Sequence, residues 1–500
     1  MLEVLYNGHK HGSGLKALLE LFCGPAEASV NRFEGKTLNG WKTRSNSTDV
    51  ILLSCLTGEK ASVLRLCKDD QGLLTIDSVV EEAPRETDPR RQIKRQLYRA
   101  LSGITGIEWP WGSLTGIRPT YVAGELLNGG LSAEQVELAL RQDYNVSKAK
   151  AELAVAAAAA EEEILQTLPP DAYAVYVGVP FCPTRCSYCS FTTQEGIGSA
   201  ARLGDAYLDR LEAEVEDYLH WQSETELGSL MAVYVGGGTP AALDDGQFRR
   251  LLQIIRRLPA AANCEWTVEA GRADVVTEAK LQALCNAGIK RICLNPQTMS
   301  EVTQGRIGRR TAPGQFQQVY ASARRNGQDI VNMDLIAGLP GEGAEDLLNS
   351  TREVLDLAPE AITLHTLAMK RGSEQSNSVQ TGTADWRALP QPALAAGLQR
   401  AQELLRSRGY RPYYLYRQHY ALGGLENVSF ARPGAETIYN VMMMSDRCSI
   451  VSFGSPAVSK RVKGKQAVRL GAPKSLRAYL DGGETFFERK RSLFSPHYLE

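Results

Sequence analysis

The sequence predicts an α/β protein: a partial barrel of six parallel strands, with an N-terminal α/β domain before it and a C-terminal α+β extension after it. Two observations support this fold class. Six short apolar runs alternate with helical segments between residues 174 and 364, and a double proline, Pro169-Pro170, separates them from a different pattern. Strands that alternate with helices pair in parallel through crossovers, as in an α/β barrel or a doubly wound open sheet.

The N-terminal part precedes this regular region. A helical stretch near 15–22 and a β-like run at 50–56 predict a small α/β unit. Residues 147–168, rich in alanine and glutamate, predict a helix that ends at the double proline, because proline cannot continue a helix. A chain of 500 residues fits roughly two to four domains. We therefore expect domains at 1–168, 169–370 and 371–500, and the sequence assigns no role to the first.

The central region repeats one strand-and-helix unit. Its predicted strands are 174–179, 231–235, 266–269, 291–294, 330–335 and 361–364. Its predicted helices are 203–219, 247–258, 277–287, 314–326 and 344–357. Parallel strands in barrels and open sheets carry their functional groups at their carboxyl ends. The residues that follow these strands should therefore share one cavity.

Three cysteines follow the first of these strands. Cys182, Cys186 and Cys189 have the spacing C-x3-C-x2-C, which predicts an iron–sulfur cluster held by three thiolates. A cluster that only carries electrons normally has four thiolate ligands, so three leave one iron open for a substrate. The other seven of the ten cysteines show no regular spacing and fit reduced thiols better than disulfides.

Glycine-rich and polar groups follow the later strands. The run Gly236-Gly-Gly-Thr-Pro240 allows a backbone to approach a ligand closely, although such a run can also be a plain turn. Glu269, Gln297 and Asp334 follow or end the next strands, and Arg309 is expected around the same rim. They could bind the ammonium, carboxylate and ribose groups of S-adenosylmethionine, or serve as hydrogen-bond partners inside the barrel.

Three further features favour a structural interpretation. His365 follows the sixth strand, and a hydrogen-bonded core histidine is the simpler reading. The tyrosine-rich run 411–420 could stack on a flat ligand, but it is more typical of a buried strand. Basic residues between 90 and 99 lie among acids on a predicted helix, which fits a solvated face.

The composition describes a globular protein without a strong charge bias. Apolar residues make up 43%, charged residues 23%, and the net charge is -1, so we expect neither nucleic acid nor anionic lipid as a partner. The first residues lack a basic region followed by an apolar one, and the apolar stretch 154–160 is too short for a bilayer. We expect a cytoplasmic monomer without a membrane anchor.

In these motifs the chain resembles radical S-adenosylmethionine (SAM) enzymes, and specifically the oxygen-independent coproporphyrinogen III oxidase family. The similarity extends over roughly residues 170–480. Besides the cysteine and glycine motifs, it includes Asn332-Met-Asp-Leu-Ile-Ala-Gly-Leu-Pro340 and Phe453-Gly-Ser-Pro-Ala-Val-Ser459. Three other runs resemble HemZ-type coproporphyrinogen dehydrogenases: Leu114-Thr-Gly-Ile-Arg-Pro-Thr120, Asn295-Pro-Gln-Thr-Met299 and Leu425-Glu-Asn-Val428. The first of these extends the resemblance into the N-terminal region.

The resemblance implies roles for individual residues. Cys182, Cys186 and Cys189 would ligate a 4Fe-4S cluster, and SAM would bind its open iron. The residues that match contacts to this first SAM are Tyr176, Gly237, Glu269 and Val458. The residues that match contacts to a second SAM are Tyr188, Gly238, Thr239, Gln297, Arg309, Asp334 and Ala368. No catalytic side chain is assigned.

The resemblance also implies a reaction in heme biosynthesis. One electron from the reduced cluster would cleave SAM to methionine and a deoxyadenosyl radical, which would abstract hydrogen from a propionate of coproporphyrinogen III. Carbon dioxide would leave, and two rounds would give protoporphyrinogen IX. An external electron donor such as flavodoxin or ferredoxin, and an electron acceptor, are required. Two other functions stay open: heme binding or transfer, and a radical SAM reaction on heme by methyl transfer and ring opening.

The chain departs from this family at two places. Gly178 stands where the family has a histidine, so any polar role of that side chain is absent. Tyr439-Asn440 stands where the heme-chaperone relatives carry a His-Asn pair, which disfavours the chaperone function.

Overall fold

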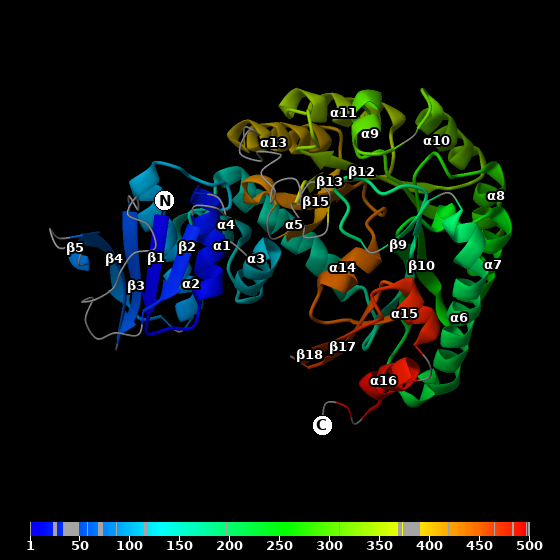
Figure 1. Ribbon diagram of the computed structural model, residues 1–500, viewed down its shortest axis with the longest axis horizontal. Coiled ribbons are helices and arrows are strands. Elements are labelled where there is room, and N and C mark those ends of the chain that lie inside the picture. The colour runs from blue at the N-terminus through cyan, green and yellow to red at the C-terminus, as the bar shows by residue number, and fades with distance from the viewer. Residues whose placement is uncertain are drawn as a thin grey trace. The chain divides into compact units, whose positions relative to one another are not determined.

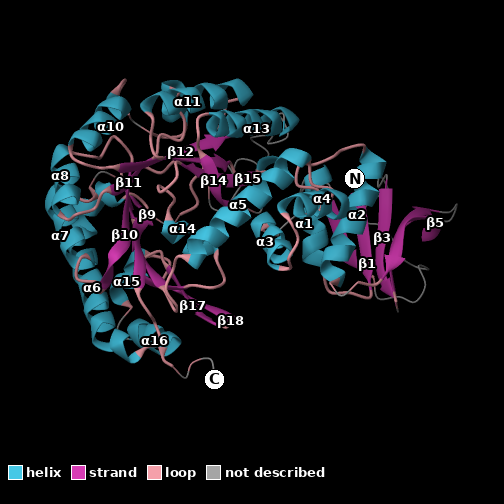
Figure 2. Cartoon of the chain, turned by 180° about the vertical axis from the view of Figure 1, so that it is seen from behind, coloured by secondary structure: helices cyan, strands magenta, loops and turns pink. Residues whose placement is uncertain are grey.

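A computed structural model describes most of the chain (Figures 1 and 2). The described residues are 2–23, 28–33, 50–57, 59–68, 74–86, 88–114, 118–191, 193–196, 198–309, 311–368, 373, 391–418, 421–464, 466–482, 485–496 and 498. Two of the sequence motifs extend beyond them, because residues 115–117 and 419–420 lie outside the described part. No described helix is both long and apolar enough to cross a membrane.

The chain folds into two compact units. The first contains 1–158, 387–395 and 415–426, and the second contains 159–386, 396–414 and 427–500. The division therefore falls inside α5 (Lys148–Gln166), whereas the sequence placed a boundary at the double proline after this helix. Two short segments from the C-terminal third of the chain also belong to the first unit.

The first unit is built on a five-stranded mixed sheet with strand order β2-β1-β3-β4-β5. Its elements are β1 (Leu2–Asn7), α1 (Gly12–Cys23), β2 (Ala28–Arg32), β3 (Val50–Thr57), β4 (Lys60–Lys68), β5 (Leu74–Pro84), α2 (Pro89–Thr105), α3 (Pro119–Asn128), α4 (Ala133–Tyr144) and the first part of α5. The predicted helix near 15–22 lies in α1, and the predicted run 50–56 is β3. Helices α1 and α2 bury their apolar faces together with Val4, Leu52 and Val63 of the sheet, which forms the core of this unit.

A buried charge connects the helical part of this unit to the short segment 415–426. The Glu426 carboxylate accepts hydrogen bonds from Trp111 Nε1 at 2.7 Å and from Lys150 Nζ at 2.5 Å. The side chains of Lys150 and Glu426 are almost wholly buried. A buried charge without a partner is very unfavourable, so these three residues depend on one another. The run 425–428 therefore contains at least one residue with a structural role.

The second unit contains the curved sheet and its helices. Its strands are β6 (Tyr173–Val179), β7 (Phe181–Cys182), β8 (Gln194–Glu195), β9 (Leu230–Gly237), β10 (Ala260–Gly271), β11 (Arg291–Leu294), β12 (Ile330–Ala337), β13 (Ala361–Thr366), β14 (Arg411–Arg417), β15 (Glu426–Ala431), β16 (Ser449–Gly454), β17 (Val458–Lys463) and β18 (Gln466–Gly471). Its helices are α6 (Ser199–Trp221), α7 (Asp245–Ile255), α8 (Glu278–Asn286), α9 (Glu301–Arg306), α10 (Gln315–Arg325), α11 (Ala344–Leu357), α13 (Gln391–Ser407), α14 (Ile438–Met444), α15 (Leu476–Asp481) and α16 (Thr485–Phe494). Short 3-10 turns lie at Gln222–Glu224, Pro240–Ala242 and Leu422–Gly424. The ends of β14, β15 and α13 extend into segments of the first unit.

The large sheet has eleven strands in the order β14-β15-β13-β12-β11-β10-β9-β6-β16-β17-β18. The six strands predicted from the sequence are β6 and β9 to β13, and they pair in parallel in chain order. The C-terminal extension adds strands at both sides: β16 pairs in parallel with β6, and β15 pairs antiparallel with β13. The extension is therefore part of the same sheet rather than a separate layer.

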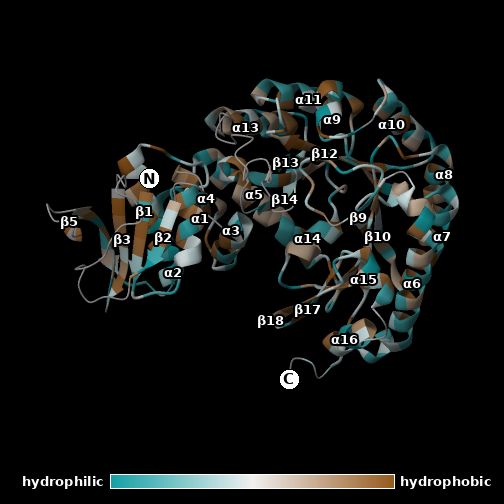
Figure 3. Cartoon of the chain, viewed as in Figure 1, coloured by the Kyte–Doolittle hydropathy of each residue, from teal (hydrophilic) through white to brown (hydrophobic). Residues whose placement is uncertain are grey.

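The helices of the repeated units cover one face of this sheet. Helices α6, α7, α8, α10 and α11 follow one another along the outside of the curved sheet in Figure 1. Neighbours in this row contact each other, α6 with α7, α7 with α8 and α8 with α10. Figure 3 shows bands of hydrophilic and hydrophobic residues along α6 to α8, as expected for amphipathic helices. The helices of the repeated units form one outer layer, which excludes the doubly wound alternative and agrees with a partial barrel.

The last helices are fixed by a buried ion pair with α6. Glu214 pairs with Lys490 of α16, and its Oε2 accepts hydrogen bonds from Tyr479 at 2.6 Å and from the backbone N–H of Gly454 at 2.9 Å. Lys490 Nζ also donates to the carbonyl oxygen of Ser452 at 2.7 Å. This pair fixes the end of β16, which lies next to β6 and the cysteine loop.

Replacement of Glu214 should destabilise the protein strongly. Glu214→Ala leaves the Lys490 ammonium buried without its counter-ion, so we expect the free energy of unfolding to fall by about 3–5 kcal/mol. Denaturant unfolding measures this change. The control is Glu216→Ala, which breaks a half-exposed pair with Arg257 and should cost about 1 kcal/mol or less. Equal losses in both variants would contradict the role of the buried pair.

Candidate active site

The three cysteines lie in a loop directly after β6. Cys182 ends the short strand β7, and Cys186 and Cys189 follow in a turn in which Cys189 N–H donates to the carbonyl oxygen of Cys186 at 2.9 Å. The loop is attached to the segment after α9. Thr184 Oγ1 donates to the carbonyl oxygen of Gly308 at 2.7 Å, and Ser187 N–H donates to that of Ile307 at 3.2 Å.

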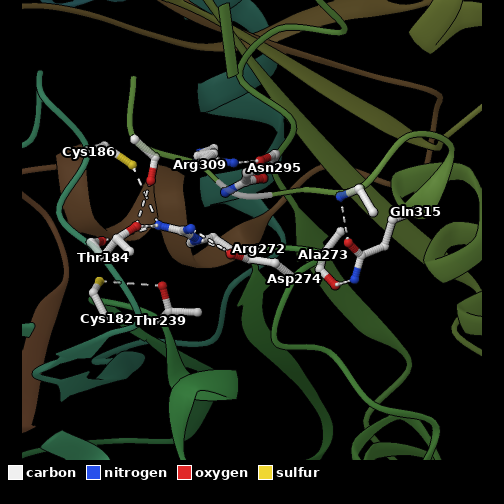
Figure 4. Close-up of polar contacts among 12 residues, drawn as sticks. Cys182, Thr184, Cys186, Thr239, Arg272, Ala273, Asp274, Asn295, Arg309 and Gln315 are labelled. Atoms are coloured by element: carbon white, nitrogen blue, oxygen red, sulfur yellow. Dashed lines mark hydrogen bonds and ion pairs between the residues drawn. The ribbon is translucent and has the colours of Figure 1, made fainter. Parts of the chain in front are cut away.

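Arg272 holds this loop from the end of β10 (Figure 4). Its NH1 donates to Thr184 Oγ1 at 2.7 Å and to the Thr184 carbonyl oxygen at 3.2 Å, and it lies 4.0 Å from Cys186 Sγ. Asp274 holds the other side of the guanidinium with two hydrogen bonds, at 2.9 and 2.6 Å. Arg272 is thus oriented by one neighbour and directs positive charge at a cysteine. The sequence analysis missed this residue, although an arginine directly after a predicted strand was a possible signal.

The glycine run braces the same loop. The backbone N–H groups of Gly238 and Thr239 donate to the carbonyl oxygens of Val179 and Phe181, both at 2.7 Å. A Cβ atom at Gly238 would lie 2.5 Å from the Phe181 oxygen, so only glycine permits this approach. These two N–H groups are therefore used within the protein. We expected the run to expose its backbone to a ligand, and for these N–H groups that expectation is wrong.

Close packing also requires glycine at position 178. A Cβ atom at this position would lie 2.3 Å from the backbone oxygen of Pro456, which belongs to the loop between β16 and β17. The Gly178 carbonyl oxygen accepts hydrogen bonds from Tyr207 Oη at 2.8 Å and from the Ser455 N–H at 3.0 Å. The C-terminal loop thus occupies the space that a side chain at position 178 would need.

A second group of polar residues lies at the ends of β11 and α9. Arg309 bonds to the carbonyl oxygen of Asn295, and its NH2 lies 3.4 Å from Tyr188 Oη. Gln297 has a positive φ of 68°, because its N–H and C=O both bond to β12, to Asp334 and Ile336 respectively. This left-handed backbone is unusual for a residue other than glycine and directs the side chain.

Three atoms of this group are buried without a hydrogen-bond partner among the described residues. They are Asn295 Oδ1, Gln297 Oε1 and Arg309 Nε. A buried polar atom that lacks a partner costs about 1–3 kcal/mol. Two acceptors and one donor left open close together fit a ligand that offers both kinds of group, as the amino acid part of SAM does.

The carboxylates Glu269 and Asp334 lie on β10 and β12. Glu269 Oε1 accepts a hydrogen bond from Tyr234 Oη at 2.5 Å, and Tyr234 Oη lies 3.8 Å from Cys293 Sγ. Burial raises the pKa of Glu269 to about 7; Tyr234 opposes this shift, Asp334 adds to it and His365 opposes it. Burial likewise raises the pKa of Cys293 well above its usual value, and both carboxylates add to that shift.

Three tyrosine rings stack beside Glu269. The ring centroids of Tyr234 and Tyr439 lie 4.6 Å apart. The ring centroid of Tyr176 lies 6.0 Å from that of Tyr439 and 6.3 Å from that of Tyr234, and all three ring planes are within 22° of parallel. Only Tyr176 was singled out from the sequence as a SAM contact. Tyr234 precedes the glycine run by two positions on β9, so the inward alternation of a strand could have identified it.

The remaining site residues predicted from the sequence lie at strand ends. Ala368 is buried two residues after the end of β13, and Val458 is the first residue of β17 and is 41% exposed. Their assignments as SAM contacts stay predictions. Residues 411–417 of the tyrosine-rich run form β14, with Tyr413 and Leu415 buried, so the interpretation of this part as a strand is confirmed.

Comparison with known proteins defines the family. Residues 176–354 match the model of the radical SAM superfamily. The chain is 35% identical over 423 residues to the oxygen-independent coproporphyrinogen-III oxidase-like protein HemZ of Bacillus subtilis, covering 81% of this chain and 82% of HemZ. It is 27% identical over 301 residues to the heme chaperone HemW of Bacillus subtilis, covering 60% of this chain and 73% of HemW.

A solved structure supports the same fold. The structure of coproporphyrinogen III oxidase (HemN) from Escherichia coli matches with a TM-score of 0.50 and 21% identity, over 66% of this chain and 72% of that one. Fold and cysteine loop together define a radical SAM protein. Within this superfamily, the chain belongs to the oxygen-independent coproporphyrinogen III oxidase family and is of the HemZ type.

This family implies a 4Fe-4S cluster and SAM, and the residues present fit both groups. Among the described residues, no three His, Cys, Asp or Glu side chains converge closely enough to hold a single metal ion. A four-iron cluster has a different requirement, since each thiolate binds a separate iron. Burial raises the pKa of the Cys182 thiol to about 11, while Thr239 and Arg272 oppose the shift. The positive charge of Arg272 beside the loop stabilises cysteines in the thiolate form that binds iron.

The cysteine assignment predicts a selective loss of the cluster. Cys186→Ala should abolish cluster assembly and SAM cleavage, because one iron loses its thiolate. Cys285→Ala should leave both at the wild-type level, because Cys285 is exposed on α8. Iron and sulfide content after anaerobic reconstitution, with quantified 5′-deoxyadenosine, measures the outcome. Equal losses in the two variants would contradict the assignment.

The raised pKa of Glu269 predicts that SAM binding depends on pH. Below pH 7 this carboxyl is mostly protonated, so it attracts a cationic ligand less. Between pH 6 and 8 the affinity of the wild-type protein for SAM should rise several-fold, and that of Glu269→Gln should be lower and nearly constant. Equilibrium dialysis of the reconstituted protein tests this. A parallel pH dependence in both proteins would assign the titration to another group.

The same shift predicts the pH dependence of stability. The pKa of Glu269 is higher in the folded protein than in the unfolded chain, so the protonated carboxyl is favoured by folding and its ionisation destabilises the protein as pH rises through about 7. Glu269→Gln should therefore gain stability relative to wild type as the pH rises from about 4.5, the usual pKa of this carboxyl, to about 7, and the difference should stay constant above pH 7. Thermal unfolding of both proteins measures this difference.

Proposed function

We propose that this protein carries out the oxygen-independent oxidative decarboxylation of two propionates of coproporphyrinogen III to vinyl groups, which gives protoporphyrinogen IX. The main support is the extent of its similarity to HemZ. The match covers 81% of the chain, whereas the match to HemW covers 60%. The similarity to HemZ therefore includes regions beyond the barrel, and this favours a function related to HemZ over one related to HemW.

The arrangement of the site is suited to this chemistry. The cluster and SAM would supply a deoxyadenosyl radical, which is the part of the reaction that the cofactor performs. The chain itself holds the cysteine loop through Arg272 and the glycine run. It offers Glu269 and Asp334 to a cationic ligand, and Gln297 and Arg309 to its polar groups. The stacked tyrosines place apolar ring surface beside Glu269.

Several further properties belong to the same proposal. Tyr176, Gly237, Glu269 and Val458 would contact the SAM on the cluster. A second SAM would contact Tyr188, Gly238, Thr239, Gln297, Arg309, Asp334 and Ala368. An external electron donor such as flavodoxin or ferredoxin would reduce the cluster, and the protein would act as a monomer.

Heme binding or transfer is the second candidate, because HemW proteins are among the relatives. One observation disfavours it. Tyr439 stands where the heme chaperones carry a histidine, and it is 5% exposed and stacked on Tyr234. Its side chain is therefore used in packing. An axial heme ligand would have to come from elsewhere.

The product of the reaction distinguishes these functions. Anaerobic protein with reconstituted cluster, reductant, SAM and coproporphyrinogen III labelled at the propionate carboxyls should release two labelled carbon dioxide molecules per protoporphyrinogen IX formed. Cys186→Ala is the control and should release none. SAM cleavage without labelled carbon dioxide would refute the proposal. Stoichiometric heme binding without turnover would then indicate the chaperone function, and methylated linear tetrapyrroles would indicate a reaction on heme.

A further inference from the structure

Three neighbouring strands place pairs of polar side chains on one face of the large sheet. β12 supplies Asn332 and Asp334, β13 supplies Thr363 and His365, and β15 supplies Asn427 and Ser429. In each pair the residues are two positions apart, so they lie on the same face of their strand. Thr363 and Ser429 are directly opposite in the antiparallel register, with their hydroxyl oxygens 3.0 Å apart. The three strands therefore form one continuous polar surface.

Asn427 fixes the proton on one side of the His365 ring. The N–H of Thr366 donates to Asn427 Oδ1 at 3.0 Å, which identifies this atom as the oxygen of the amide. His365 Nδ1 lies 3.2 Å from the same oxygen. A carbonyl oxygen can only accept, so Nδ1 must carry a proton. Any change of charge on the imidazole must then occur at Nε2.

The second ring nitrogen faces Asp334. His365 Nε2 lies 3.5 Å from Asp334 Oδ2, and Asp334 Oδ1 accepts a hydrogen bond from Asn332 Nδ2 at 2.8 Å. Asn332 Oδ1 in turn accepts from Thr363 Oγ1 at 3.1 Å. If Nε2 were unprotonated, its lone pair would face a carboxylate oxygen and repel it. A proton on Nε2 makes the contact attractive, so the geometry favours an imidazolium beside Asp334.

The charges near this pair support the same protonation state. Two carboxylates, Glu269 and Asp334, face the interior within the influence of His365, and Cys293 and Tyr234 are the other titratable groups next to them. One imidazolium compensates only one of the two negative charges, so the pair of carboxylates together still favours a cation. SAM carries both a sulfonium and an ammonium group.

Asn427 bears a cost that packing alone does not explain. Its Nδ2 is buried and has no hydrogen-bond partner among the described residues, and such a donor costs about 1–3 kcal/mol. A leucine of similar size would avoid this cost but would remove the acceptor of the Thr366 N–H. Besides that hydrogen bond, the asparagine orients the ring of His365.

We propose that His365 is a positioning residue of the SAM site: held by Asn427, it carries a positive charge that directs the Asp334 carboxylate toward the bound SAM. This inference rests on the proposed role of Asp334 as a SAM contact. It also revises the interpretation of His365 as a core histidine, since its side chain is 26% exposed and faces a functional carboxylate.

The first test measures SAM binding to the full-length reconstituted protein. His365→Gln should weaken the affinity for SAM about tenfold or more and leave the iron and sulfide content unchanged, as is typical for residues that orient a binding group. His220→Gln is the matched control, because His220 is exposed on α6 and its ring, among the described residues, lies against the Glu216 carbonyl oxygen alone. Equal affinities in the two variants would overturn the proposal.

The second test requires no cofactor. The ¹⁵N NMR signals of His365 in protein with labelled histidine are assigned as those that the His365→Gln variant lacks. In the wild-type protein at pH 7 they should be those of an imidazolium. Asn427→Asp should preserve these signals, and Asn427→Leu should shift their titration to lower pH. A neutral ring at pH 7 in the wild-type protein, whether its proton is on Nδ1 or on Nε2, would overturn the proposal. Wild-type protein that binds SAM but releases no carbon dioxide from coproporphyrinogen III would refute the decarboxylase function and leave this inference standing.

Discussion

The position of the cysteine loop depends on backbone contacts made by the strands beside it. β6 and β9 are parallel neighbours, so the loop after one lies against the glycine run after the other. Two short backbone hydrogen bonds join them, and glycine at position 238 permits this approach. Arg272, at the end of the next strand β10, holds the cysteine loop through Thr184. A cluster ligated by this loop is thus placed by the sheet itself rather than by a flexible segment.

The interior of the large sheet has to accommodate charge where water is scarce. Glu269 is half-buried beside three stacked tyrosines, and Asp334 is held by Asn332 and His365. Burying a carboxylate is unfavourable unless it is neutralised or paired. The protein meets this constraint in two ways, by a raised pKa at Glu269 and by a nearby imidazole at Asp334. Both solutions leave the site ready for a cationic ligand.

The departure from the family at Gly178 follows from the same sheet. β16 pairs with β6 and brings Pro456 so close to position 178 that a Cβ atom does not fit. The C-terminal region therefore replaces a side chain that the family resemblance would place here. This region is anchored in turn by the buried pair of Glu214 and Lys490. Sequence changes at 178 and in the loop 454–457 should be considered together.

The sequence by itself determined the six parallel strands, their helices and the cysteine motif, because hydrophobic periodicity and ligand spacing are local properties. It also located Glu269, Gln297 and Asp334 at strand ends, with Arg309 on the same rim. Only the tertiary structure decided which distant residues meet: Arg272 with Thr184, Tyr439 with Tyr234, and β16 with β6. These contacts depend on the order of strands in the sheet, which no local pattern encodes. The sequence alone favoured a core residue at His365. Its partner Asn427 lies on β15, which is 62 residues later in the chain, so no local pattern could reveal the contact.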